Sequence, residues 1–120
     1  MPATAGRYAW VLSADTRVRV AYAGAPGSFA EDAVLATYPQ AETVPVPMFA
    51  DVPSAVEAGD VAAGVLPIEN VVGGGVREVY DLLHDTEATI VGEVIVPVRL
   101  CLAGLPGDRL EDIERVYSHI

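Results

Sequence analysis

The sequence predicts an α/β domain built on a parallel sheet. Short apolar runs alternate with amphipathic stretches of roughly ten residues, the rhythm of β-α-β units. The most informative run, residues 61–66, is small and apolar and stops at Pro67, which cannot donate a ladder hydrogen bond. Glu69 and Asn70 follow, then three glycines at 73–75 and a helical pattern. We therefore expect a buried strand, a polar turn and a helix in succession.

The first half of the chain predicts two strands and two helices, over residues 17–23, 29–37, 41–46 and 50–58. The first strand alternates and then becomes wholly apolar. Ser28 and Glu31 have the three-residue spacing of a capping box, so the first helix begins after Ser28. Tyr38-Pro39 ends that helix, and Gly59 ends the second.

The second half begins with a helix over 76–84, whose apolar residues Val76, Val79, Tyr80 and Leu83 share one face. Four further segments follow: a long strand over 89–98, an apolar run over 100–105, a short helix over 110–115 and the start of a strand at 116–118. This change of rhythm predicts a crossing into a second lobe. We expect a mobile leader at 1–17, a first lobe at 18–88 and the start of a second lobe at 89–120.

Charge and hydropathy exclude several partners. The net charge is −10, from seven arginines, no lysine and seventeen acids, which disfavours nucleic acid. No run approaches the ~20 apolar residues of a membrane-spanning helix. The apolar stretch at 8–12 is too short for the ~7–15-residue core of a secretory signal, so we expect a cytoplasmic protein.

The single cysteine, Cys101, lies between two leucines, where a free cysteine usually behaves as a small buried hydrophobe. No base stands near it in the sequence to activate it as a nucleophile. His84 and His119 have no metal-ligand spacing with it or with each other, so we expect no metal site.

Several motifs occur together in one order along the chain. They cover residues 20–29, 65–70, 80–83, 90–93 with Pro97 and Cys101-Leu102, and 115–119. In this order and spacing the chain resembles the amino-terminal part of the catalytic domain of prephenate dehydratases, and it is also similar to arogenate dehydratases. A collinear set of this kind is far more specific than any one motif.

The resemblance implies a two-lobed fold like the type II periplasmic binding proteins, present as one nearly complete lobe and the start of a second. It also implies conversion of prephenate to phenylpyruvate with loss of carbon dioxide and water, a step of phenylalanine biosynthesis. The partner is then a small dicarboxylate, no cofactor is needed, and the full-length form is expected to be a homo-oligomer. Such an enzyme must bind a dianion and assist a leaving hydroxyl with an acid.

The chain departs from the pattern that the resemblance implies. Serines are expected where Val71 and Gly75 stand, and paired histidines where Arg99 and Leu100 stand. The expected Ser-His-Pro-Gln motif breaks at Ile120, which stands where proline is expected. The Thr-Arg motif implicated in leaving-group assistance and the regulatory ACT domain do not fall within residues 1–120, so the catalytic residues are unknown and the chain alone is expected to be inactive.

The resemblance implies five substrate-binding candidates: Asn70, Gly74, Gly75, Ser28 and His119. The Asn70 amide contacts substrate or bonds its own backbone in a turn. Glycine N–H groups of the turn cradle a carboxylate, or the glycines are a flexible linker. Ser28 caps its helix or also faces the cleft.

Two further residues have alternative roles. Glu69 ties the turn to a neighbouring amide or acts as a general acid, and Arg99 is a solvated arginine or a bidentate carboxylate contact. Two other functions also remain open: a non-catalytic carboxylate-binding lobe, and a related enzyme that decarboxylates prephenate without expelling the hydroxyl.

Overall fold

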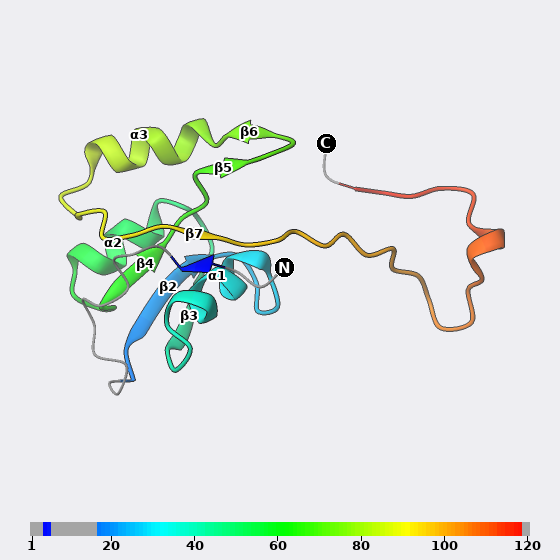
Figure 1. The fold of residues 1–120 in the computed structure, drawn as a ribbon, viewed down its shortest axis with the longest axis horizontal. Coiled ribbons are helices and arrows are strands. Elements are labelled where there is room, and N and C mark those ends of the chain that lie inside the picture. Colours follow the sequence, from blue (N-terminus) through cyan, green and yellow to red (C-terminus); the bar gives the residue numbers. More distant parts are fainter. Residues whose placement is uncertain (1–3, 6–16, 119–120) are drawn as a thin grey trace.

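A computed structural model of the chain describes residues 4–5 and 17–118. Its centre is a three-stranded parallel sheet of β2 (Arg19–Ala23), β3 (Glu42–Val46) and β4 (Ala63–Val65) in the order β3-β2-β4 (Figure 1). Val20 of β2 lies opposite Thr43 of β3 and Ala63 of β4. The parallel α/β architecture predicted from the sequence is confirmed.

The helices α1 (Phe29–Thr37) and α2 (Asp51–Glu57) cover opposite faces of the sheet, because successive side chains of β2 point to opposite sides. Val20 and Tyr22 pack with Val34 of α1, whereas Ala21 packs with Val52 of α2. These five side chains are at most 1% exposed. The core is therefore two small clusters, one on each side of the central strand.

The turn predicted after β4 is a β-hairpin. Its two strands, β5 (Glu69–Asn70) and β6 (Gly74–Gly75), pair antiparallel, and Val76 N donates to Ile68 O at 2.8 Å. The helix α3 (Arg77–Asp85) follows within one residue of the predicted position. Hairpin and helix lie together above the sheet in the view of Figure 1.

The prediction of a long strand over 89–98 is wrong. Only β7 (Val94–Ile95) is a strand, and it pairs antiparallel with β1 (Thr4–Ala5). A strand needs a neighbour for its ladder hydrogen bonds, and no other described segment pairs with 89–93 or 96–98. Thr4–Ala5 lie inside the predicted leader, and residues 6–16 lie outside the described part, so the boundary at 17 stays a prediction.

After β7 the chain runs as an extended segment away from the sheet (Figure 1). The helix predicted over 110–115 is a single 3₁₀ turn, η1 (Leu110–Asp112), and residues 116–118 form no strand. Cys101 is exposed, contrary to the prediction that it is buried. The apolar pattern of this segment indicates burial, but the described residues supply no surface to cover it. None of the described helices is long and apolar enough to cross a bilayer.

Candidate functional site

The carboxyl ends of β2 and β4 define the candidate site. The chain runs from β2 through α1 to β3 on one side and then crosses to β4 on the other side of β2, so the strand order reverses at β2. Ligands of open α/β sheets bind beside the carboxyl ends of strands at such a reversal. The loop 24–28 follows β2 at this edge, and the β5–β6 hairpin follows β4.

Asn70 shapes the tip of the hairpin. Its Oδ1 accepts hydrogen bonds from Val72 N at 2.9 Å and Gly73 N at 3.3 Å. The turn role weighed for this residue is therefore confirmed. Because both backbone groups are donors, the oxygen must face them, and Nδ2 points elsewhere. Nδ2 has no partner among the described residues, and the side chain is exposed.

The two candidate glycine amides are not equivalent. Antiparallel pairs alternate between hydrogen-bonded and non-hydrogen-bonded. Val76 N donates to Ile68 O, so Ile68 and Val76 form a hydrogen-bonded pair, and Asn70 and Gly74 form the next one. Glu69 and Gly75, between them, form a non-hydrogen-bonded pair. The Gly74 N–H thus faces Asn70 inside the hairpin, whereas the Gly75 N–H points outward. Gly74 also has φ 75°, the left-handed conformation that favours glycine.

Ser28 lies at the start of α1, on the neighbouring loop. Its Oγ accepts from Glu31 N at 3.4 Å, which confirms the N-cap role. The Glu31 carboxylate accepts from Gly27 N at 2.7 Å and from Thr43 Oγ1 at 2.8 Å, so the capping box is displaced by one residue and also holds β3. The Gly27 N–H, followed by the Thr43 hydroxyl, lowers the pKa of Glu31. No described hydrogen bond joins Ser28 to Asn70.

Tyr22 places a phenol between β2 and α1. Its hydroxyl is buried and makes no hydrogen bond of good geometry with a described residue, although the Glu31 carboxylate lies near it. Burial, and then the negative charge of Glu31, raise the pKa of Tyr22. The hydroxyl therefore stays protonated under ordinary conditions and carries no charge into the core.

A second carboxylate, missed by sequence reasoning, holds the connection after α3. Glu57 Oε1 accepts from Thr86 Oγ1 at 2.5 Å and from Glu87 N at 2.8 Å. These bonds, the Thr86 hydroxyl first, lower the pKa of Glu57. They fix residues 86–87 to the end of α2. No local pattern could have revealed them, because the partners are about thirty residues apart.

The remaining candidates, Glu69, Arg99 and His119, make no described contact that assigns them a role. Glu69 and Arg99 are exposed, the expected tie from Glu69 to a neighbouring amide is absent from the described contacts, and His119 lies outside the described residues. The described part contains no group of three or more side chains that could hold a metal ion.

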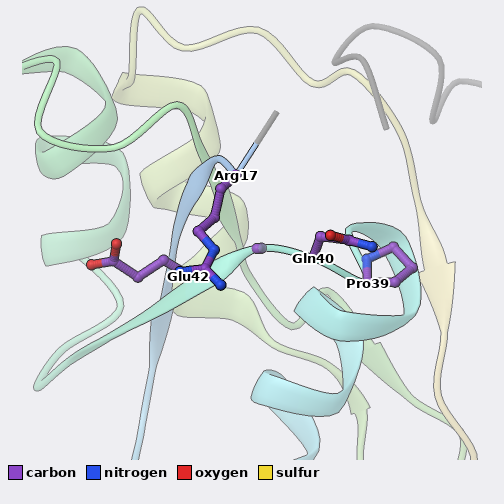
Figure 2. A pocket seen from close by; sticks show the side chains of 5 residues that line it. Arg17, Pro39, Gln40 and Glu42 are labelled. Atoms are coloured by element: carbon purple, nitrogen blue, oxygen red, sulfur yellow. The ribbon is translucent and has the colours of Figure 1, made fainter. Parts of the chain in front are cut away.

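A shallow pocket of about 400 Å³ lies at the wrong edge of the sheet for this site. Arg17, Pro39, Gln40, Ala41 and Glu42 line it at the amino end of β3 (Figure 2). The carboxyl ends of the parallel strands lie at the opposite edge. We therefore assign it no role in the candidate site.

Comparison with known proteins identifies the family. The sequence model described as Prephenate dehydratase matches residues 20–120. The chain belongs to the prephenate dehydratase family. It is 47% identical over 105 residues to arogenate dehydratase/prephenate dehydratase 1, chloroplastic, of Arabidopsis thaliana, which covers 88% of this chain and 27% of that protein. It is 41% identical over 118 residues to arogenate dehydratase 2 of Petunia hybrida, covering 98% and 30%.

A solved structure supports the fold. The X-ray structure of prephenate dehydratase from Streptococcus mutans matches with a TM-score of 0.55 and 32% identity, over 58% of this chain and 38% of that one. The described α/β lobe therefore has the fold of this family, which is like that of the type II periplasmic binding proteins. The chain spans less than a third of the length of the two plant relatives named above.

Proposed function

We propose that the full-length protein containing this chain converts prephenate or arogenate to the aromatic product by loss of carbon dioxide and water. The observation that carries the proposal is the family match over residues 20–120, combined with a hairpin at the carboxyl edge of the sheet that leaves two donors unused. These donors are Asn70 Nδ2 and the Gly75 N–H. Both are neutral hydrogen-bond donors, which suits the carboxylates of either substrate.

The chemistry divides into binding and proton transfer. Asn70 Nδ2 and the Gly75 N–H would bind one carboxylate against the surplus of negative charge on the chain, because local donors can oppose the global field. The substrate's other carboxylate leaves as carbon dioxide, its electron pair enters the ring, and the ring hydroxyl departs as water after protonation. The acid stays unassigned, since the expected Thr-Arg motif is not within residues 1–120.

Experiment decides between prephenate and arogenate, because one relative named above is an arogenate dehydratase/prephenate dehydratase and the other is an arogenate dehydratase. The two substrates differ only in a keto or an amino group on the side chain. A homo-oligomeric state and a cytoplasmic location remain parts of the proposal; the latter rests on the short apolar stretch at 8–12.

The experiment is a turnover assay of the full-length protein with each substrate in turn. Phenylpyruvate is followed by its absorbance in base, and phenylalanine by chromatography. Product from at least one substrate supports the proposal. Binding of prephenate without product would instead support the alternative of a non-catalytic carboxylate-binding lobe, and loss of carbon dioxide without loss of water would support the decarboxylase.

A further inference from the structure

The ring of Tyr80 lies directly over Gly75. A Cβ added to Gly75 would stand 2.8 Å from Tyr80 Cε2, 3.3 Å from its Oη and 3.5 Å from its Cζ. The first distance is too short for any real side chain, so this ring position requires glycine at 75. Tyr80 lies one helical turn after the hairpin, where its N–H donates to Val76 O at 3.3 Å. The ring from helix α3 therefore occupies the space that a side chain at position 75 of the hairpin would need.

The contact also places a hydroxyl beside an unused amide. Tyr80 Oη lies 3.3 Å from the place where a Cβ of residue 75 would be. Backbone N and Cβ of one residue are about 2.5 Å apart, so Oη is within about 6 Å of Gly75 N. One carboxylate can span such a gap with its two oxygens.

The Tyr80 hydroxyl is available to a ligand. The side chain is 48% exposed, and none of the hydrogen bonds between described residues involves the hydroxyl. A phenol hydroxyl is a neutral donor, whereas an ionised carboxylate only accepts. The hydroxyl can therefore donate a hydrogen bond to a carboxylate oxygen, and it favours a carboxylate over an apolar group at this position.

We infer that Tyr80 is a substrate contact of this site, its hydroxyl donating to the same carboxylate that the Gly75 N–H binds. This inference rests on the proposed function. It adds to the site a residue that holds one carboxylate of the substrate, from a ring position that leaves no room for a side chain at 75. Glu69 lies opposite Gly75 in the hairpin, on the same face, and its carboxylate is an acceptor that could compete for the hydroxyl.

The test compares Tyr80→Phe with wild type in the full-length protein. The variant removes only the hydroxyl, so we expect kcat/KM to fall by about tenfold or more, as for a lost hydrogen bond to a charged group, with little change in Tm. Tyr38→Phe, at the far end of α1, is the matched control and should behave as wild type. A kcat/KM within twofold of wild type for Tyr80→Phe overturns the inference.

A second pair of variants moves the hydroxyl to residue 75. Tyr80→Leu should be as impaired as Tyr80→Phe, and Gly75→Ser combined with Tyr80→Leu should recover kcat/KM several-fold, because the ring no longer blocks a side chain at 75. A double variant no better than Tyr80→Leu contradicts a shared hydroxyl position. If Tyr80→Phe has no effect in a Glu69→Gln background, the hydroxyl acts through Glu69 and direct contact is refuted.

Failure of the proposed function is read separately, from wild type. If wild type turns over neither substrate, the proposed function fails, and calorimetric titration with prephenate tests Tyr80 on its own. Weaker binding by Tyr80→Phe than by wild type and Tyr38→Phe supports the contact. Equal binding by all three proteins, or no binding by any, overturns it.

Discussion

Replacing Gly64 with alanine tests how β4 is positioned, and therefore how the hairpin is positioned. An alanine Cβ at 64 would overlap Val52 Cγ1 of α2 and stand 3.4 Å from Val56 Cγ2. Val52 is 1% exposed, so its side chain cannot swing into solvent to relieve the overlap. Overpacking of this kind costs about 1–3 kcal/mol, partly offset by the ~0.5–1 kcal/mol gained by removing a glycine from a strand. We expect a net loss of about 1–2 kcal/mol.

The matched variant is Val52→Ala, which removes the atom that alanine 64 would strike. Two buried carbons and the cavity they leave should cost about 2–3 kcal/mol on their own. With the overlap gone, Gly64→Ala/Val52→Ala should be no less stable than Val52→Ala, which is a coupling of at least ~1 kcal/mol. Urea unfolding followed by circular dichroism measures all four proteins. A Gly64→Ala protein as stable as wild type, with additive effects in the double variant, would refute the close packing of α2 on β4.

Three further predictions concern the supports of the site. Ser28→Ala should lower the free energy of unfolding by about 1 kcal/mol, and Ser28→Gly by only a few tenths, as measured by urea unfolding, because glycine is also tolerated at an N-cap. Val34→Ala, which opens the cluster under α1, should cost about 2–3 kcal/mol in the same assay. Because the folded pKa of Glu57 is lowered, its bonds to Thr86 and Glu87 stabilise the fold above the ordinary glutamate pKa, and this contribution disappears as the pH falls through the lowered value. Thermal melts from neutral pH to pH 3 should therefore show a smaller acid loss for Glu57→Gln than for wild type.

The first half of the fold could be predicted because its signals are local. The strand 19–23, the N-cap Ser28 and the helix 29–37 follow from alternation, a capping residue and an apolar period within a few positions of each other. The opposite faces covered by α1 and α2 then follow from a parallel sheet whose strand order reverses.

The second half could not be predicted to the same extent, because strands depend on partners. The apolar residues of 89–98 indicate strand propensity, but only Val94 and Ile95 find a partner among the described residues. The hairpin at 69–75 was also missed: its glycines resemble a linker, and its register depends on the Asn70 side chain and the left-handed Gly74.

The site shows the same division. The turn role of Asn70 and the cap role of Ser28 were among the alternatives, because both are local hydrogen bonds. The stacking of Tyr80 on Gly75 and the bonds of Glu57 to residues 86–87 join different elements and leave no pattern in the sequence. The substrate-binding roles of Asn70, Gly74, Gly75, Ser28 and His119 stay predictions.

The most direct test of the proposed site compares Asn70→Asp with Asn70→Ala in the full-length protein. Aspartate keeps the acceptor for Val72 N and Gly73 N but lacks the Nδ2 donor and adds a negative charge, whereas alanine lacks both groups. If Nδ2 binds a substrate carboxylate, kcat/KM should fall in both variants by roughly 30- to 900-fold, which corresponds to the ~2–4 kcal/mol typical of a lost anion-binding donor. The exposed Arg77→Ala control should keep the kcat/KM of wild type. An Asn70→Asp enzyme with the kcat/KM of wild type would contradict the account and leave Asn70 with its turn alone.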